Sequence, residues 1–271
     1  MKSLNLIGGG RVGRTLARLW QASGHYRVQD VLTRSEQTAN EAIQFIGAGR
    51  AVSQLSELRA ADVWMLAVPD RQIAPVAAEL AHLSQGSAAA IAFHCSGALA
   101  AAELTPLRDL GWSVASAHCL LSFATPQAAL QQFAGTPCAL EGDPLALAEL
   151  EPSFTTIGAR CFALAAEHKL LYHAGAVFAS NFAPVLQAVA NQLWHDSGVP
   201  ADVAARLNAT LLKNVVDNML ALGPAAALTG PAARGDLALV QRQGKAVTAW
   251  NPTAGEAYRA LSQLAAKLAT P

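Results

Sequence analysis

The chain opens on a short apolar run that leads at once into three glycines with the spacing of a dinucleotide-binding turn. Residues 4–7 are apolar apart from one asparagine, Gly8-x-Gly10-x-x-Gly13 follows, and apolar residues then recur at helical spacing as far as Ser23. In such a turn the first glycine permits the sharp bend, the second lets the backbone approach a pyrophosphate, and the third lets the helix pack closely on the strand. The sequence therefore predicts a strand, a glycine turn and a helix that together bind a dinucleotide.

The start of that helix supplies a second part of the expected phosphate site. Its first N–H groups have no partner within the helix and lie at the positive end of the helix dipole. We therefore expect the cofactor to contact Gly8, Gly10, Arg11, Val12 and Gly13. The alternative is a Rossmann-like fold whose nucleotide site has decayed.

The composition is that of an ordinary globular enzyme. The chain has 271 residues, enough for one large or two moderate domains, and 52% of them are hydrophobic. The chain has 19 basic residues (Lys and Arg) and 19 acidic residues (Asp and Glu), so its net charge is zero. Nothing in this balance indicates a nucleic-acid partner. We see no apolar run that suits a membrane span. The first strand begins so close to residue 1 that we expect no signal peptide.

The four cysteines indicate a reducing compartment. Cys95, Cys119, Cys138 and Cys161 match neither a CxxC pair nor the spacing of a zinc site. We therefore expect reduced thiols in a cytoplasmic protein and no bound metal.

Apolar runs alternate with helical patterns through the first half of the chain. The expected strands cover residues 4–7, 27–32, 63–68, 89–93, 113–117, 137–140 and 161–164, and the expected helices cover residues 11–23, 37–46, 73–83, 99–110 and 144–157. This alternation predicts an α/β fold with a mainly parallel, Rossmann-like sheet. Ligands of such a sheet bind beyond the carboxyl ends of its strands.

The pattern becomes helical after residue 165. Long alanine-rich helices are expected over residues 167–197, 200–222 and 256–268, with no convincing strand among them. We therefore expect two domains: a Rossmann-like dinucleotide-binding domain over residues 1–165 and an all-helical substrate and dimerisation domain over residues 166–271.

The end of the second strand bears on the choice of cofactor. NAD sites place an acid there to bind the ribose hydroxyls. Here the strand runs into Thr33, Arg34 and Ser35, and a guanidinium suits a 2′-phosphate because it gives paired, charge-assisted hydrogen bonds. This pattern favours NADP bound by these three residues. The alternative is that Asp30, which precedes the strand end, serves NAD.

Polar residues follow the next strands at the same edge of the expected sheet. Val68 and Pro69 should lie beside the nicotinamide half of the cofactor, and Asp70 should cap the following helix. The segment His94-Cys95-Ser96-Gly97 follows one strand, and His118 follows the next.

If those two strands are neighbours, His118 can approach Ser96 and His94. A histidine that titrates near neutrality beside a hydroxyl suits proton transfer in carbonyl or alcohol chemistry, and we expect His118 to be such a group. The alternative is that the two histidines only stabilise strand ends.

The helical half adds three further candidates. His173 and Asn181 are eight residues apart on one expected helix, so both can face the crevice and bind substrate. Arg234 lies in a segment, residues 229–236, that interrupts the helices, and its guanidinium can pair with a substrate carboxylate. The alternative is a helix break closed by an Arg234–Asp236 pair.

These motifs, taken in order, resemble one family along nearly the whole chain. They are the glycine turn, residues 67–70, His94 to Ala98, His118 with Phe123, His173 to Asn181, and Thr229 to Asp236. They resemble NADP-dependent oxidoreductases with a Rossmann-like N-terminal domain and a helical C-terminal domain of unknown function. Enzymes of the 6-phosphogluconate dehydrogenase-like, pyrroline-5-carboxylate reductase and prephenate dehydrogenase groups look related. The resemblance implies a helical domain that dimerises and completes the active site, and it assigns no substrate.

The chain departs from the family pattern at two places. The catalytic histidine of prephenate dehydrogenases is followed by proline, whereas His118 is followed by Cys119. Related hydroxyacid dehydrogenases use a helix lysine with an asparagine four residues on, and Lys169 and Asn181 do not have that spacing. That catalytic pair is therefore not transferred.

The sequence favours an NADP-dependent oxidoreductase that passes a hydride to or from a small, carboxylate-bearing substrate. His118, helped by Ser96 and His94, is the first candidate for proton transfer, and His173, Asn181 and Arg234 are candidates for the substrate site. The alternatives are a nucleotide sensor without turnover and a structural dimer with a vestigial site. We expect a homodimer built from the helical domain.

Overall fold

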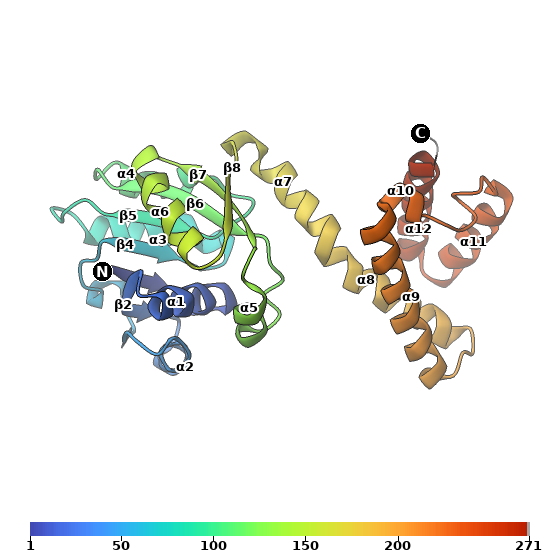
Figure 1. Cartoon of the computed structure of the whole chain (residues 1–271), viewed down its shortest axis with the longest axis horizontal. Coiled ribbons are helices and arrows are strands. Elements are labelled where there is room, and N and C mark those ends of the chain that lie inside the picture. Colours follow the sequence, from blue (N-terminus) through green and yellow to red (C-terminus); the bar gives the residue numbers. More distant parts are fainter. Residues whose placement is uncertain (270–271) are drawn as a thin grey trace. The chain divides into compact units, whose positions relative to one another are not determined.

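The computed structural model describes residues 1–269 and divides into two compact units (Figure 1). The first unit runs from Met1 to Ser180 and the second begins at Asn181. The first unit includes helix α7 (Lys169–Ala176), because side chains of this helix contact the ends of the sheet strands.

The first unit is built on one eight-stranded sheet with the order β3-β2-β1-β4-β5-β6-β7-β8. All neighbouring strands are parallel except β6 and β7. The strands are β1 (Lys2–Ile7), β2 (Tyr26–Leu32), β3 (Arg50–Val52), β4 (Val63–Leu66), β5 (Ile91–His94), β6 (Ser113–Cys119), β7 (Pro137–Gly142) and β8 (Arg160–Ala163). The strand order reverses between β1 and β4, and dinucleotides bind at such a switch point. The predicted fold class is confirmed.

Alternate residues of the central strands bury two separate cores, one on each face of the sheet. Met65 on β4 belongs to one core, and its neighbours Trp64 and Leu66 belong to the other. The period of two follows from the pleat of a strand. In the first core Trp20 lies against Phe93 and Phe154, with ring centroids 6.1 and 5.0 Å away.

Six helices accompany the sheet in the first unit, besides α7. They are α1 (Arg11–Ser23), α2 (Glu36–Ile46), α3 (Asp70–Leu83), α4 (Thr105–Arg108), α5 (Pro126–Gln132) and α6 (Pro144–Thr156). Helix α1 places Leu16 and Trp20 in the first core, whereas α3 places Ile73 and Leu80 in the second. Covered faces make the sheet rigid, so the strand ends can hold polar side chains in fixed positions.

One expected helix was wrong, and some short or interrupted elements were missed. The helix expected over residues 99–110 is a 3₁₀ turn (Ala101–Leu104) followed by the short α4, because Pro106 lacks an N–H and obstructs a continuous helix. Strand β3 was missed because three residues carry no readable alternation. Helix α11 (Leu237–Trp250) was missed because Gly244 interrupts its helical pattern.

The second unit contains only helices among its described residues. They are α8 (Phe182–Asp196), α9 (Ala201–Leu222), α10 (Pro224–Ala227), α11 and α12 (Pro252–Ala269), and a π-helical turn, Val177–Asn181, precedes α8. Helix α9 packs on α8 and α10, and α11 packs on α12. Only Ala204 and Gly255 are buried between residues 181 and 269. Within residues 1–269, no helix combines the length and apolar character needed to cross a membrane.

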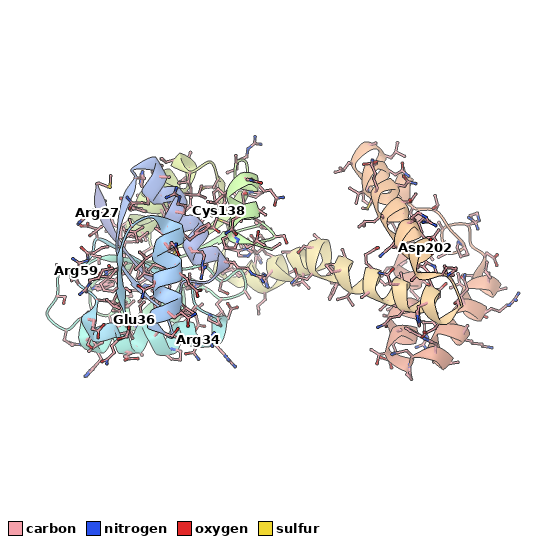
Figure 2. The ribbon with its side chains drawn as sticks, turned by 90° about the horizontal axis from the view of Figure 1, so that it is seen from below. Arg27, Arg34, Glu36, Arg59, Cys138 and Asp202 are labelled. Carbon is pink, nitrogen blue, oxygen red and sulfur yellow. The ribbon has the colours of Figure 1, made fainter. Side chains whose placement is uncertain are left out.

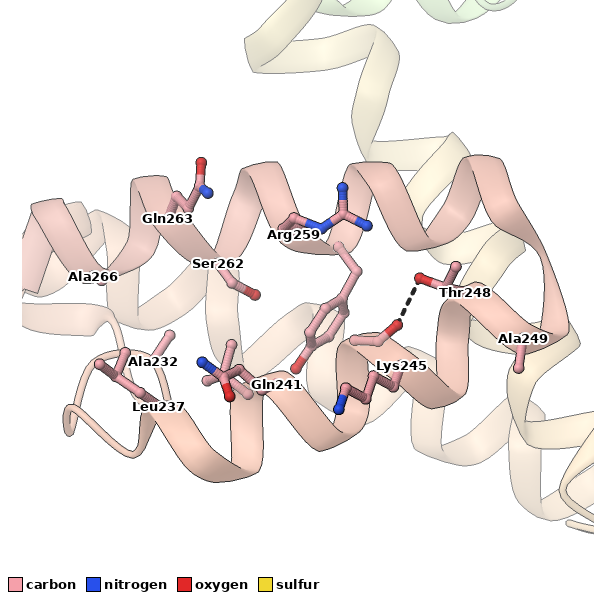
Figure 3. Close-up of a pocket in the computed structure, with 13 residues that line it drawn as sticks. Ala232, Leu237, Gln241, Lys245, Thr248, Ala249, Arg259, Ser262, Gln263 and Ala266 are labelled. Carbon is pink, nitrogen blue, oxygen red and sulfur yellow. Dashed lines mark hydrogen bonds between the residues drawn. The ribbon is translucent and has the colours of Figure 1, made fainter.

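Helices α11 and α12 line an open groove with a volume of about 790 Å³ (Figure 3). Its wall is mainly apolar, with Leu237 and Val240 on one helix and Ala266 on the other. Lys245 and Arg259 also line the groove.

Candidate functional site

The glycine turn after β1 has the close backbone contacts that the spacing predicts. Gly8 has φ +103°, and a Cβ there would lie 2.3 Å from the carbonyl oxygen of Ala67 after β4. A Cβ on Gly13 would lie 2.3 Å from the carbonyl oxygen of Gly8. Gly10, the residue before α1, has no atom within 4 Å of such a Cβ. Two of the glycines are therefore needed for packing, and the third leaves open space in front of the helix start, where Arg11 and Val12 begin α1.

The turn after β2 is ordered by its own hydroxyl groups. Thr33 Oγ1 donates to the carbonyl of Ser35 at 2.8 Å and lies 2.5 Å from Thr38 Oγ1. Ser35 caps α2 by accepting from the N–H of Thr38. Between them Arg34 is exposed, and it makes no hydrogen bond or ion pair within residues 1–269 (Figure 2). A free guanidinium thus stands on a fixed turn at the end of β2.

Asp30 is occupied elsewhere. Its buried carboxylate accepts hydrogen bonds from the guanidinium of Arg50 at 2.9 Å and from that of Arg59 at 2.6 Å, and from the backbone N–H of Arg59. Burial alone would raise the pKa of Asp30, but the hydrogen bonds from Arg59 and Arg50 lower it to about 2. This acid is engaged on both oxygens two residues before β2 ends, so it is not placed to serve a ribose.

Asp70 does not cap α3 with its side chain, so that expectation was wrong. Pro69 occupies the capping position, and Asp70 is the first helical residue. Its carboxylate accepts a hydrogen bond of 2.9 Å from Ser96 Oγ after β5. Val68 and Pro69 follow Ala67, the first residue after β4, and β4 is paired with both β1 and β5.

Strands β5 and β6 are neighbours, and His94 is paired with Ser116. The imidazole of His94 is buried, with Nε2 2.9 Å from the carbonyl of Ala100 and Nδ1 accepting from the N–H of Ser96. Both contacts form only in the neutral tautomer with the proton on Nε2. Burial lowers the pKa of His94 to about 4. His94 therefore fixes the turn after β5, with both ring nitrogens in use.

Beneath that turn lies a buried lysine that was not predicted as a site residue. Lys169 on α7 is 1% exposed, and its Nζ donates to Ser116 Oγ at 2.7 Å and to the carbonyl of Ser96 at 3.3 Å. Burial lowers the pKa of Lys169, although Glu141 and Asp70 act in the opposite direction. No carboxylate within residues 1–269 forms an ion pair with it.

His118 stands with two side chains of α7. Its Nδ1 lies 2.9 Å from Tyr172 Oη, and its ring centroid lies 5.5 Å from that of His173. A Cβ on Gly97 would lie 2.7 Å from His118 Cε1 and 2.6 Å from His173 Nδ1, so only glycine leaves room for both rings. Burial, then the nearby charges of His173 and Lys169, lower the pKa of His118 to about 4. The expectation that His118 titrates near neutrality was therefore wrong.

The structure thus gathers some of the expected residues and separates others. Ser96, His118 and His173 meet at the carboxyl ends of β5 and β6, together with Tyr172 and Lys169, which were missed. The sequence contains a signal that could have placed these residues together: Lys169, Tyr172 and His173 have the i, i+3, i+4 spacing of one helix face. Cys119, which replaces the expected proline, lies at the end of β6 with its thiol 3.5 Å from that of Cys138.

Asn181 and Arg234 belong to the second unit, and their assignment to a substrate site stays a prediction. Arg234 is exposed on the turn after Gly230, and its backbone N–H donates to the carbonyl of Gly230. Asp236 caps α11 rather than pairing with Arg234. No group of histidine, cysteine or acidic side chains within residues 1–269 is arranged to hold a metal ion.

Two family models together cover most of the chain. A Rossmann-like domain matches residues 2–119, and a domain of unknown function, DUF2520, matches residues 136–265. The chain therefore combines a Rossmann-like N-terminal domain with a DUF2520 C-terminal domain, and the domain pair predicted from its motifs is confirmed. No curated protein matches it.

Solved structures similar to this chain extend over its full length. Protein TM1727 from Thermotoga maritima is 27% identical with a TM-score of 0.75, and 98% of each chain is covered. BF3122 from Bacteroides fragilis, provisionally an NADP oxidoreductase, is 22% identical with a TM-score of 0.77 over 98% of each chain. Pyrroline carboxylate reductase from Plasmodium falciparum, solved with NADP bound, is 12% identical with a TM-score of 0.60, covering 99% of this chain and 98% of that one. The fold is that of NAD(P)-dependent dehydrogenases and reductases.

Proposed function

We propose that the protein is an NADP-dependent oxidoreductase that transfers a hydride between the nicotinamide and a small, carboxylate-bearing substrate. The observation that carries this proposal is Lys169, a buried ammonium group at the carboxyl ends of β5 and β6. Among residues 1–269 its hydrogen-bond partners are neutral, the carbonyl of Ser96 and the hydroxyl of Ser116. Burying an unpaired charge is costly, so such groups cluster at sites where a ligand supplies the opposite charge. A substrate carboxylate, or negative charge that develops on a reacting oxygen, would supply it here.

The residues present suit a bound NADP. The space in front of Gly10 accepts a pyrophosphate, and the free guanidinium of Arg34 with the hydroxyls of Thr33 and Ser35 suits a 2′-phosphate. The engaged carboxylate of Asp30 supports NADP over NAD, because this acid already accepts hydrogen bonds from Arg50 and Arg59. The nicotinamide would supply or accept the hydride, with Val68 and Pro69 beside it.

The chain's own groups then hold the substrate and its developing charge. His118 and His173 line the surface of the cluster, and Lys169 adds positive charge from below. Ser96 and Ser116 hold Lys169, while Asp70 holds the Ser96 hydroxyl. We keep Asn181 and Arg234 as proposed substrate-binding residues from the helical unit.

The proposed function is tested by nucleotide titration and a turnover screen. Intrinsic fluorescence should report tighter binding of NADP than of NAD, and a panel of hydroxy acids, amino acids, oxo acids and imines should change the reduced-nicotinamide absorbance. Binding without turnover of any panel member would favour a nucleotide sensor. A protein that binds neither nucleotide would favour a vestigial site.

Arg34→Ala is expected to weaken NADP binding selectively. The guanidinium would give charge-assisted hydrogen bonds to the 2′-phosphate, and such bonds contribute about 1.5–3 kcal/mol. Affinity for NAD, which lacks this phosphate, should hardly change. Equal losses for the two nucleotides, or wild-type protein that binds NAD more tightly, would refute the NADP assignment.

We further propose that the second unit is covered by the same unit of a second copy. Helix α9 exposes apolar side chains over about 220° of its circumference, and a helix that is apolar most of the way round belongs in a protein interior. These side chains are Leu207, Leu211, Leu212, Val215, Val216, Met219, Leu220 and Leu222. Neither apolar core includes any of residues 181–269, the part of this unit that the structure describes.

The surface area supports the same proposal. The chain exposes 14810 Å², whereas two separate compact bodies of the sizes of these units would expose about 13,300 Å² in total. The open groove between α11 and α12 adds apolar surface that a helix of the second copy can cover (Figure 3). Obligate dimers bury about 2,000–5,000 Å² of such surface.

Sedimentation equilibrium at micromolar concentration should therefore give about twice the chain mass of 28.1 kDa. Val215→Asp, on the exposed face of α9, should shift the protein to monomer, whereas Leu145→Asp, on α6 in the first unit, should leave the dimer intact. A wild-type monomer at these concentrations would contradict the proposal.

A further inference from the structure

We propose that Tyr172 holds His118 in the neutral tautomer that carries its proton on Nε2, so that His118 gives a hydrogen bond to a carbonyl or imine substrate that is being reduced. This inference rests on the proposed function and specifies the direction that the site favours. His118 would stabilise charge on the reacting atom without acting as a base toward an alcohol.

The hydrogen bond between the two side chains decides the tautomer. Tyr172 Oη lies 2.9 Å from His118 Nδ1. A phenol is a better hydrogen-bond donor than a neutral imidazole N–H, and an unprotonated imidazole nitrogen is a better acceptor than a phenol oxygen. Burial raises the pKa of Tyr172, so its hydroxyl keeps its proton. Tyr172 therefore donates to Nδ1, and the proton of a neutral imidazole must lie on Nε2.

The other side of the ring is open. Within residues 1–269, His118 Nε2 has no hydrogen-bond partner, and it is not among the buried polar atoms that lack one. By contrast, His173 Nδ1 is buried against Gly97 without a partner. The Nε2–H of His118 is thus a donor without a protein partner among the described residues, and a substrate atom can reach it.

The groups around the ring keep it neutral. Lys169 and His173 on α7 disfavour a second proton, Asp70 on α3 opposes them weakly, and burial has the largest effect. A neutral donor suits reduction: the carbonyl carbon gains a hydride from the reduced nicotinamide, its π electrons move to oxygen, and water supplies the proton that completes the alcohol. A preorganised donor aimed at that oxygen stabilises the charge as it develops.

The test reads the tautomer directly in the protein without substrate. Protein labelled with ¹⁵N-histidine, observed at pH 7.5, should show one His118 spin system with an unprotonated Nδ1 and a protonated Nε2. These signals, assigned by their loss in His118→Gln, should persist unchanged to pH 6. Tyr172→Phe should lose the single-tautomer signature, whereas Tyr258→Phe, whose hydroxyl contacts Gln243 in the second unit, should keep it. A wild-type His118 with its proton on Nδ1, or an imidazolium at pH 6.5, would overturn the proposal whatever the activity of the protein.

The donor role has a second test once a substrate is found. The amide nitrogen of glutamine reaches toward the position of Nε2, whereas that of asparagine stays near Nδ1. The rate of substrate reduction by the His118→Gln variant should therefore be at least about 10-fold higher than that of His118→Asn. One well-placed hydrogen-bond donor contributes about 10²–10³ to such a rate. Equal rates for the two variants would overturn the donor role. Absence of turnover in wild-type protein would count against the proposed function and leave the tautomer result standing.

Discussion

Gly10→Ala should weaken nucleotide binding without destabilising the protein. The new methyl group meets no atom within 4 Å and Gly10 has φ −71°, so the folded backbone accepts alanine. The methyl group would, however, fill the space in which the pyrophosphate approaches the backbone. Each hydrogen bond lost to a charged phosphate costs about 1.5–3 kcal/mol, and the free energy of unfolding should change by less than about 1 kcal/mol.

Gly13→Ala should do the opposite and destabilise the fold. Its Cβ would lie 2.3 Å from the carbonyl oxygen of Gly8 and 3.0 Å from Leu6 Cδ1, so α1 would have to move away from β1. Overpacking of this kind costs about 1–3 kcal/mol or more. Urea titration and NADP titration of both variants separate the two effects, with Gly175→Ala, whose Cβ meets nothing within 4 Å, as the control. If Gly10→Ala binds NADP as tightly as wild-type protein, the phosphates do not lie against this turn.

The sheet could be predicted well because its signal is local. Each central strand is an apolar run bounded by turn residues, and the glycine turn fixes where the first strand ends and the first helix begins. Elements without a local signal were lost. Strand β3 is three residues long and shows no period, and the continuous helix expected over residues 99–110 is instead a 3₁₀ turn followed by α4, which carries Pro106 in its first turn.

The candidate site could be predicted only in part because its contacts join distant segments. Ser96 and His118 were found because they follow strands, and parallel neighbours end at one edge. Lys169 was not found, because a lysine on a helix is usually solvated and its burial depends on how α7 meets the strand ends. The pKa of His118 was misjudged for the same reason, because burial and the nearby side chains of His173 and Lys169 lower it.

Lys169→Met should abolish most of the turnover and leave the protein as stable as before, or more so. Methionine keeps the length and apolar stem of lysine, and the partners left behind, a serine hydroxyl and a carbonyl, still hydrogen-bond to each other. Removing an ammonium that stabilises charge developing on the substrate should reduce kcat by about 10²–10³-fold. NADP affinity should be unchanged, because the residues proposed to bind its phosphates lie in the turns after β1 and β2.

The pH dependence of stability provides a second measure of the same charge. Because the folded pKa of Lys169 lies below its ordinary value of 10.5, the folded state binds fewer protons than the unfolded state between those two pKa values. The destabilisation caused by burying charged Lys169 therefore has its full size below the pKa of the folded state. It decreases as pH rises past that pKa. Lys169→Met should lack that alkaline gain in the free energy of unfolding, whereas Lys2→Met, which removes an exposed ion pair with Glu149, should retain it. A Lys169→Met protein that loses several kcal/mol of stability but keeps its turnover would assign Lys169 a structural role and remove the observation on which the proposed function rests.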